Sequence, residues 1–405
     1  MIRTLFAGAE FRVMCVSEIL SVTGDQLSRV GVTLVAFSRT DSAALTGLVY
    51  ALTYLPNVLG AFFFSSVGDR RPRREVLVGI DAVRVVSVAA MAVSSVPLPV
   101  LCLLVAVGSF LNGPYKAVRL ALLGDVLTAE QYGAGMAVRQ SANQVAQLAG
   151  FALGGIVSSA FGPRLCFVLD AVTFAAAAVL VRAYVRFRPA AATPAQRRSV
   201  LAGLRVVWGE KGRRAIFLST FSGLFLVAPE GVVAPYVDGL GLGSAWVGYL
   251  LAGAAAFSIL GLALFTRLVP ERSRPSVFPF VSLAAGTPLL LVALGGGPYL
   301  ALAAFGLSSA LWSVQVVLSV SFLAAMLPAE QRSQGMGVAA ATNLTAAGLG
   351  TALMGVIGQA TGPATAIALA GGGCILFALW PGTLWIRRAT NSDAPRGTSD
   401  AAVRD

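Results

Sequence analysis

A stretch of 37 residues at 127–163 occurs a second time at 327–363, and this repeat constrains the fold more than any other feature of the sequence. Sixteen of the 37 aligned positions are identical without a gap, whereas chance would give only a few. Both copies end in a Gly-Pro pair, at Gly162-Pro163 and Gly362-Pro363. The offset of 200 residues is far too long for a solenoid repeat. The sequence therefore predicts two tandem copies of one large unit.

The composition places both copies in a membrane. Of the 405 residues, 57% are hydrophobic and only 12% are charged, and the mean hydropathy is +0.79. Such a chain has too little polar surface to cover a water-soluble globule of this size. Its apolar runs are close to the roughly 20 residues that a helix needs to cross a hydrocarbon core of about 30 Å. We therefore expect an all-α membrane protein.

Six apolar runs in each copy predict twelve transmembrane helices in two six-helix pseudo-repeats. The predicted spans are about 13–38, 43–66, 76–96, 98–118, 133–160 and 164–184, then 215–238, 244–267, 277–295, 298–324, 333–359 and 364–386. The first run lacks an early cleavage site, so we expect it to remain as a span. The predicted parts are an N-terminal bundle at 1–184, a linker at 185–214, a C-terminal bundle at 215–388 and a disordered polar tail at 389–405.

Basic residues indicate the orientation of these helices. They gather in alternate loops, whereas the opposite loops have little beyond Arg39 and Arg164. Loops rich in Lys and Arg stay in the cytoplasm, so we expect a multi-pass protein of the inner or plasma membrane with both termini cytoplasmic. The net charge of +12 follows from these loops, and we expect no nucleic-acid partner. The basic residues assigned to the cytoplasmic loops are Arg70, Arg71, Arg73, Arg74, Lys116, Arg119, Arg267, Arg272, Arg274 and Arg332.

The linker is strongly basic, and Val200, Leu204, Val207 and Trp208 follow one another in it at helical spacing. This pattern predicts an amphipathic helix on the inner membrane surface, with its basic face toward anionic lipid headgroups. Membrane lipid is therefore an expected partner. Binding of a protein partner is the alternative.

The loop after the second predicted span carries a motif. Its sequence, SSVGDRRPRRE at 65–75, resembles the signature that the major facilitator superfamily places between its second and third helices, although Ser65 and Pro72 stand where that signature has glycine. The resemblance implies the major facilitator fold and a role in gating for the matching residues. An ordinary basic cytoplasmic loop is the alternative. The matching residues are Asp69, Arg70, Arg73 and Arg74.

A closer resemblance is to the exporter branch that includes enterobactin-type siderophore exporters and actinobacterial drug efflux proteins. Members commonly have Ser-x-x-Gly-Asp in helix 1 and Asp-x-x-Arg in helix 3, and this chain has Ser21 to Asp25 and Asp81 to Arg84. The resemblance implies that Asp81 and Arg84 belong to the gate. A structural ion pair between them is the alternative.

Small residues of helices 5 and 11 form a further candidate feature. In helix 5, AGFALGG resembles the antiporter signature Gly-Pro-x-x-Gly-Gly, with Phe151 in place of its proline, and this resemblance implies antiport. Glycines let helix backbones approach closely, so we expect an interface between two rocking halves. A static interface is the alternative. The glycines concerned are Gly150, Gly154, Gly155, Gly350 and Gly355.

Four carboxylates inside the predicted spans are candidates for proton coupling, because ionisable groups in a membrane usually line a cavity or pair with one another. Asp25 lies near the middle of helix 1, with Arg29 as an i,i+4 partner. Glu230 lies between Pro229 and Gly231, where a helix is easily interrupted. Structural ion pairs are the alternative for each. The four candidates are Asp25, Glu230, Glu18 and Asp170.

Uncharged polar residues scattered through the apolar spans are candidates for contact with a substrate. Such a lining suits a bulky, mostly apolar molecule held by a few polar groups better than a sugar, which needs many hydrogen bonds. The candidates are Asn57, Asn112, Gln144, Gln147, Gln315 and Asn343.

The sequence has no histidine, no Walker loop and no nucleophile with a base beside it. We therefore expect no enzymatic activity, no cofactor and no metal. If transport is active, the proton gradient is the natural source of energy, and carboxylates must carry the proton because histidine is missing.

These observations predict a monomeric secondary transporter that exports a hydrophobic or amphipathic small molecule, such as a drug, an antibiotic or a siderophore-like compound, in exchange for protons by alternating access. The first alternative is an uptake permease on the same fold, which accumulation in inverted vesicles would distinguish. The second is a lipid-handling or sensory membrane protein, which lateral openings lined by basic residues would favour.

Overall fold

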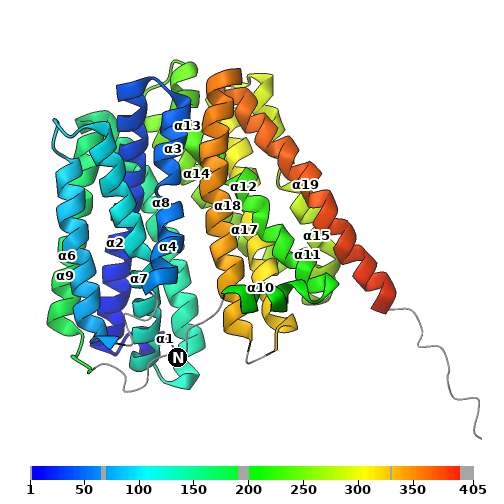
Figure 1. The fold of residues 1–405 in the computed structure, drawn as a ribbon, viewed down its shortest axis with the longest axis horizontal. Coiled ribbons are helices and arrows are strands. Elements are labelled where there is room, and N and C mark those ends of the chain that lie inside the picture. Colours follow the sequence, from blue (N-terminus) through cyan, green and yellow to red (C-terminus); the bar gives the residue numbers. More distant parts are fainter. Residues whose placement is uncertain (1, 65–69, 190–199, 329–330, 393–405) are drawn as a thin grey trace, which may run out of the picture.

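The computed structural model describes residues 2–64, 70–189, 200–328 and 331–392. Every element in this part of the chain is a helix, and the helices form two bundles side by side (Figure 1). The start of the chain and the end of the last helix, α19 (Pro363–Ser392), lie at the same side of the molecule (Figure 1). We call this side the terminal side, and the opposite one the far side.

The first bundle contains six spans, preceded by the short α1 (Ile2–Leu5). The second span is divided into two helices by a turn at 52–54. The spans are α2 (Ala9–Thr40), α3 (Ala43–Ala51) with α4 (Leu55–Phe64), α6 (Arg73–Met91), α7 (Leu98–Val126), α8 (Ala129–Phe161) and α9 (Pro163–Tyr184).

The second bundle is more interrupted. Breaks precede α13 and α16, which carry Pro229 and Pro288 in their first turns, because proline cannot donate the backbone hydrogen bond that would continue a helix. The first span consists of α11 (Lys211–Ser219), the 3-10 helix η1 (Thr220–Ser222), α12 (Gly223–Leu226) and α13 (Pro229–Gly239). The others are α14 (Ala245–Leu268), then η2 (Glu271–Ser273), α15 (Arg274–Ala284), α16 (Thr287–Leu290) and η3 (Leu291–Leu294), then α17 (Gly297–Met326), α18 (Arg332–Thr361) and α19.

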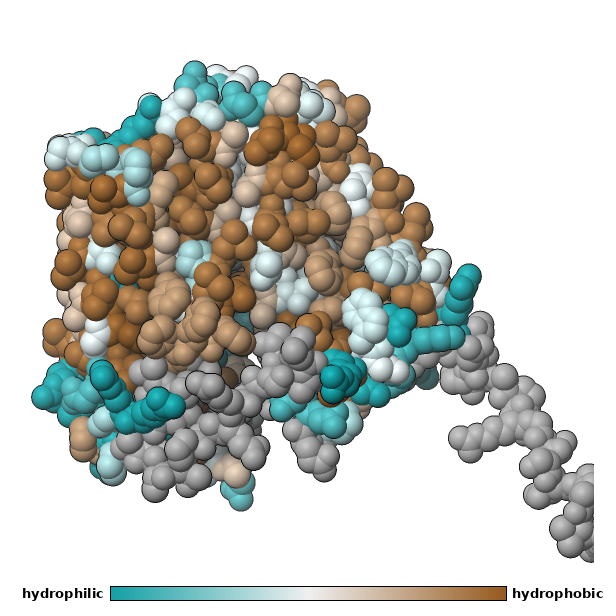
Figure 2. All heavy atoms as spheres, viewed as in Figure 1, coloured by the Kyte–Doolittle hydropathy of each residue, from teal (hydrophilic) through white to brown (hydrophobic). Residues whose placement is uncertain are grey.

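Helices occupy all twelve predicted spans. In the described part of the chain, ten helical segments are long and apolar enough to cross a membrane. The other two spans, α2 and α6, are too polar for that criterion because they carry charges such as Asp25 and Asp81. On the face that Figure 2 shows, apolar residues cover most of the middle, and hydrophilic residues gather at the two ends. The prediction of an all-α membrane protein is confirmed.

Several predicted boundaries are wrong. The third span ends at Met91 and not at 96, and α19 continues to Ser392, into the segment predicted to be disordered. The fourth span differs most. The fourth span was expected to end at 118, but α7 continues to Val126. Lys116 and Arg119 therefore belong to a transmembrane helix, although their charge suggested a cytoplasmic loop. The helix continues through them because its polar face lies against the interior of the molecule, where Arg119 is only 2% exposed.

The two bundles are joined near the far side. The main contacts are those of α3 with α18 and of α8 with α14. At the far end of α18, the Gln359 Oε1 accepts hydrogen bonds from the Ser42 Oγ at 3.0 Å and from the Ala43 backbone N–H at 2.8 Å. These bonds hold the end of α18 to the start of α3.

The linker helix α10 (Val200–Trp208) packs on the second bundle. Val207 is fully buried, and Gly203 lies against Val338 of α18. The predicted helix is present, but α18 covers part of the apolar face that was expected to meet lipid, while Trp208 stays 44% exposed. Linker residues 190–199 and the end of the predicted tail, 393–405, lie outside the described residues.

Candidate functional site

A central cavity of about 1150 Å³, its open mouth included, lies between the two bundles. The first bundle lines it with α2, α4, α6, α7 and α8, and the second with the break before α13 and with α17 and α18. Its lining extends from Tyr54 and Glu230, near the joined region, to Arg119 and Arg139 toward the terminal side.

The charges around the central cavity are distributed unevenly. Eight of the lining side chains are charged, five basic and three acidic, and seven of the eight belong to the first bundle. They are Glu18, Asp25, Arg29, Arg84, Lys116, Arg119 and Arg139 from the first bundle, and Glu230 from the second.

Glu230 joins the two bundles. Because α12 ends at Leu226 and α13 starts at Pro229, Glu230 lies in the first turn after the break. Its Oε2 accepts one hydrogen bond from the Tyr50 hydroxyl at 2.8 Å and another from the Tyr54 hydroxyl at 2.9 Å. Both tyrosines belong to the second span of the first bundle, so one carboxylate binds across the interface.

Arg29 extends toward the same group of residues. Its Nη1 donates to the Tyr54 hydroxyl at 3.2 Å, and its guanidinium carbon lies 4.7 Å from the centre of the Tyr54 ring. The expected i,i+4 ion pair with Asp25 does not form, because the Arg29 guanidinium contacts the hydroxyl and the ring of Tyr54 instead. Among the described residues, the Asp25 carboxylate has no hydrogen bond or ion pair within 4.0 Å, and it faces the cavity.

Glu18 is the centre of an ion cluster within the first bundle. Its carboxylate forms an ion pair with the Arg139 guanidinium, through Nε at 2.9 Å and Nη2 at 2.8 Å. The Arg119 Nε lies 3.5 Å away, and the Asn143 Nδ2 donates to Glu18 at 3.0 Å. Two cations therefore offset one carboxylate.

The equivalent place in the second bundle is neutral. In the first bundle, the Arg119 Nη2 donates to the Ser17 hydroxyl at 2.7 Å. At position 319, which is 200 residues after Arg119, the chain has serine, and the Ser319 hydroxyl lies 3.0 Å from that of Ser219. The residue 200 positions after Ser17 is Phe217, so a different pair, of two hydroxyls, stands here in place of the charged contact.

Asp81 and Arg84 do not form an ion pair, although both belong to the described residues and both are nearly fully buried. The Tyr115 hydroxyl donates to Asp81 at 3.3 Å. The Arg84 guanidinium lies over the rings of Tyr115 at 4.7 Å and Phe174 at 5.1 Å. Tyr115 therefore connects the two predicted gating residues.

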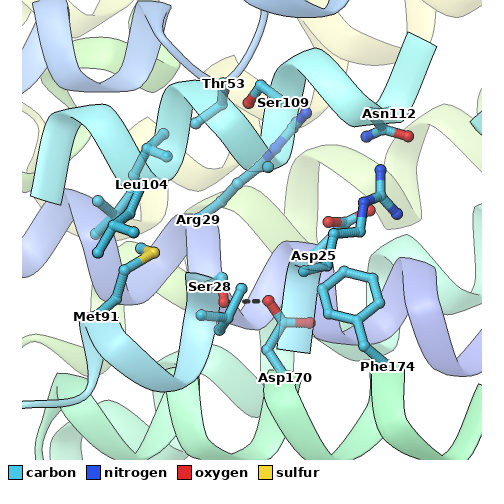
Figure 3. Close-up of a pocket in the computed structure, with 15 residues that line it drawn as sticks. Asp25, Ser28, Arg29, Thr53, Met91, Leu104, Ser109, Asn112, Asp170 and Phe174 are labelled. Atoms are coloured by element: carbon cyan, nitrogen blue, oxygen red, sulfur yellow. Dashed lines mark hydrogen bonds between the residues drawn. The ribbon is translucent and has the colours of Figure 1, made fainter. Parts of the chain in front are cut away.

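Asp170 lies in a second cavity, of about 520 Å³, inside the first bundle. It accepts a hydrogen bond from the Ser28 hydroxyl and another from Thr173 at 3.4 Å. Figure 3 shows this pair, with Asp25 and Phe174 beside it. The two cavities adjoin, because four side chains line both. These are Asp25, Arg29, Arg84 and Asn112.

The structure describes only part of the first-loop motif. Asp69 lies outside the described residues, and Arg70 is exposed on the terminal side. Arg73 forms an ion pair with Asp125 near the end of α7. This pair fixes the start of α6 to the end of α7.

The start of the linker is also held to the first bundle. The Arg74 Nη1 donates to the Val185 carbonyl at 3.3 Å. Glu10 accepts from the Arg188 Nη2 at 2.8 Å and from the Arg186 backbone N–H at 2.6 Å. Burial opposes ionisation of Glu10, but these hydrogen bonds and charges outweigh it and lower the pKa of Glu10. The contacts of ionised Glu10 with Arg186 and Arg188 are therefore fully present at neutral pH, and they are lost as the pH falls through that lowered pKa.

The predicted substrate contacts divide into two groups. Asn57, Asn112, Gln147 and Asn343 line the central cavity. Gln144 and Gln315 are not brought to it: Gln144 accepts from Gln147 at 3.3 Å, and the Gln315 Nε2 donates to the Ser219 carbonyl and the Ser222 hydroxyl, both at 3.1 Å.

The predicted packing glycines also divide. A Cβ on Gly155 would lie 2.8 Å from the Cα of Gly248, and one on Gly355 would lie 3.0 Å from the Cα of Gly47. These two contacts join the bundles at equivalent positions of the repeat, and neither leaves room for a side chain. The other three glycines pack within their own bundles, Gly150 and Gly154 on α2 and Gly350 on α12.

Sequence reasoning missed several residues of the site. Tyr50 and Tyr54 are four positions apart, which places two hydroxyls on one helix face, and this spacing was the available signal. Arg139 is a cation inside a predicted span, and it could have been proposed as the partner of Glu18. Lys116 and Arg119 were noticed but assigned to a loop.

Solved structures of membrane transporters share this fold. They include a peptide transporter in complex with sulfate, with a TM-score of 0.75, 14% identity and coverage of 93% of this chain and 94% of that chain. The nucleoside transporter NupG has a TM-score of 0.73 and 14% identity, and the match covers 92% of this chain and 99% of that chain. A bacterial homologue of the human lysosomal transporter Spinster has a TM-score of 0.72 and 14% identity, and the match covers 94% of this chain and 97% of that chain. These identities show the fold alone.

Two curated proteins are similar in sequence. A chloramphenicol resistance protein of Streptomyces lividans is 30% identical over 285 residues, which cover 69% of this chain and 67% of that protein. The uncharacterised transporter YjbB of Bacillus subtilis (strain 168) is 26% identical over 378 residues, which cover 85% of this chain and 88% of that protein. The family model of the Major Facilitator Superfamily matches residues 14–318. The chain therefore belongs to the Major Facilitator Superfamily, a family of membrane transporters and not of enzymes, as its first loop predicted.

Proposed function

We propose that this transporter exports a hydrophobic or amphipathic small molecule across the cell membrane in exchange for protons. The similarity to a chloramphenicol resistance protein supports export. The terminal side is cytoplasmic in this proposal, because exposed basic residues such as Arg70 and Arg272 lie there. A single chain carries the whole central cavity, which supports action as a monomer.

The bridge from Glu230 to Tyr50 and Tyr54 is the observation that carries the proposal. It crosses the interface at the end of the cavity that lies nearest the joined region. For the cavity to open on the far side, the second span of the first bundle must move away from α13. That movement takes both hydroxyls from the carboxylate.

Loss of this bridge gives a physical basis for proton exchange. An ionised carboxylate without partners is costly in a poorly hydrated site, and binding a proton removes most of that cost. Glu230 would therefore take up a proton when the far side opens. It would release the proton when the far side closes, because the two hydroxyls and nearby Arg29 then stabilise the charge. Protons would thus move opposite to an exported substrate.

The remaining predicted residues receive supporting roles in this proposal. Asp25 is the second proton carrier, since it faces both cavities and has no hydrogen-bond or ion-pair partner in the described part of the chain. Asp170 and Glu18 are its alternatives. The polar contacts to the substrate come from Asn57, Asn112, Gln147 and Asn343. The gate on the terminal side includes Arg73, Arg74, Asp81 and Arg84, and Asp69 and Arg70 from the first-loop motif.

Drug susceptibility gives the first test. The chain is expressed in a strain that lacks its own efflux pumps, and a panel that includes chloramphenicol is applied. We expect higher inhibitory concentrations for at least one compound, and an ATP-independent, uncoupler-sensitive accumulation of that compound in inverted vesicles. Accumulation in right-side-out vesicles instead would identify an uptake permease.

Proton coupling is tested with the Glu230→Gln variant, which keeps the shape of the side chain but cannot titrate. Substrate-dependent proton release from purified protein should disappear in this variant, while exchange of labelled for unlabelled substrate continues. Glu271→Gln is the matched control, because the Glu271 side chain is 88% exposed at the start of η2 on the terminal side. Normal proton release from Glu230→Gln would contradict the proposed role.

A further inference from the structure

We propose that the transported molecule carries an acidic group, a carboxylate or a phosphate, and that Lys116 binds this group. The inference deepens the proposed function, since it takes the central cavity as the substrate site. The proposed substrates are hydrophobic or amphipathic acids, in contrast to hydrophobic cations and neutral compounds, which apolar cavities also accept.

Lys116 is a cation of the central cavity that has no hydrogen-bond or ion-pair partner among the described residues. It lines the central cavity from α7 and is exposed there, one helical turn beyond Asn112, which lines the same cavity. Its ammonium makes no hydrogen bond or ion pair with any residue that the structure describes. Three neighbouring cations do have such a partner: Arg29 donates to Tyr54, Arg119 to Ser17 and Arg139 to Glu18. The fourth, Arg84, lies over the rings of Tyr115 and Phe174 instead.

The charges around Lys116 are mostly positive. Its electrostatic neighbours are one carboxylate, Asp25, and three guanidiniums, those of Arg29, Arg84 and Arg139. The other two carboxylates of the cavity are already engaged, Glu18 by Arg139 and Arg119, and Glu230 by two tyrosine hydroxyls. An excess of positive charge on one wall of the cavity favours a ligand of the opposite charge.

Two further lining groups lack partners. Gln26 is 6% exposed, and its Oε1 has no hydrogen-bond partner among the described residues. The buried Nε1–H of Trp312, on α17 of the second bundle, has none there either. Both residues line the central cavity, among apolar side chains such as Phe151 and Leu344.

These features define a class of ligand. Lys116 offers a positive charge on one wall, Trp312 offers a hydrogen-bond donor on the opposite bundle, and Gln26 offers an amide between apolar surfaces. A molecule that satisfies all three has an acidic group, a hydrogen-bonding substituent and an aromatic or aliphatic body. The competing possibility is that the Asp25 carboxylate alone balances the charge of Lys116, in which case the ligand needs no negative charge.

Matched compounds distinguish these possibilities. We would measure dissociation constants by calorimetry on purified protein in detergent, with naphthalene, biphenyl and phenylpropyl skeletons, each as the carboxylate, the phosphonate, the carboxamide and the aminomethyl compound. Acids should bind best on at least one skeleton. Lys116→Gln should weaken the acids about tenfold to a hundredfold, the range expected for one charged hydrogen bond. Its effect on the amides should be small, and Lys116→Arg should keep most of the preference for acids.

Chemical labelling gives a second readout. Lys116 and Lys211 are the two lysines of the sequence, so reductive methylation followed by peptide mass spectrometry reports on each separately. Bound acids should protect Lys116 and leave Lys211 unprotected. Lys211 is exposed at the start of α11, and Lys211→Gln is the matched control in the binding experiment.

The outcomes separate this inference from the proposed function. If no acid binds, or if amides and amines bind as well as acids and Lys116→Gln changes nothing, the inference is overturned while export itself stands. If acids bind through Lys116 but Glu230→Gln keeps its proton release, the inference stands and the proposed coupling fails.

Discussion

The three carboxylates that line the central cavity differ in their contacts, and these contacts can be tested by substitution. Glu230 has two tyrosine hydroxyls, Glu18 has two guanidiniums, and Asp25 has no partner among the described residues. The contacts of Glu18 lie within one bundle and do not depend on how the bundles sit, whereas those of Glu230 cross the interface between them. Of these two predicted proton carriers, Glu230 is therefore the one that movement of the bundles affects directly.

Removal of the tyrosine hydroxyls should favour opening on the far side. Each hydroxyl donates to a charged carboxylate, a bond worth about 1.5–3 kcal/mol, so the double variant Tyr50→Phe, Tyr54→Phe should shift the conformational equilibrium by at least tenfold. Spin labels on Ser95 and Leu294, both exposed and in different bundles, would report the distance. A distance distribution identical to that of the wild type would contradict the bridge.

Replacement of Glu18 should damage stability more than coupling. Glu18→Gln leaves Arg119 and Arg139 facing one another without a carboxylate, and breaking a buried ion pair costs about 3–5 kcal/mol. Thermal unfolding in detergent should therefore occur at a clearly lower temperature. The double variant Glu18→Gln, Arg139→Gln should recover part of the loss, and an unchanged unfolding temperature in the single variant would argue against a structural cluster.

Among the elements, the repeat predicted more of the fold than of the site. It placed Gly155 and Gly355 at equivalent positions, and both lie where the bundles touch. The sequence could not show that Lys116 lines a cavity, because a charge near the end of an apolar run looks the same in a loop and in a polar helix face. The hydroxyl partners of Glu230 were equally hidden, since they depend on how the break before α13 meets the other bundle.

The two glycine contacts should control closure of the far side. Gly155→Ala adds a Cβ that would lie 2.8 Å from both the Ala245 carbonyl oxygen and the Gly248 Cα. Backbone atoms cannot yield as a flexible side chain would, so the bundles should separate at this point. The same spin-label pair should show a longer distance, and transport should fall. Gly124→Ala is the control, because nothing lies within 4 Å of its added Cβ.

At the scale of the whole molecule, the orientation in the membrane can be tested with single cysteines. Ser95→Cys, on the far side, should react with an impermeant thiol reagent added to intact cells, whereas Arg272→Cys, on the terminal side, should react only after permeabilisation. Three natural cysteines are buried and Cys102 is partly exposed, so a Cys102→Ser background limits unwanted labelling. Labelling of Arg272→Cys in intact cells would reverse the proposed direction of transport.

The concentration of cavity charge in one bundle has an electrical consequence. The membrane potential acts on any charge that moves across the bilayer, with about 2.3 kcal/mol per elementary charge for a drop of 100 mV. The first bundle carries seven of the eight charged side chains that line the central cavity in the described structure, two of them acidic and five basic. Rocking of that bundle therefore displaces net charge through the field, while the same movement of the second bundle displaces little beyond Glu230. We expect voltage to bias the transport cycle even where no pH difference exists.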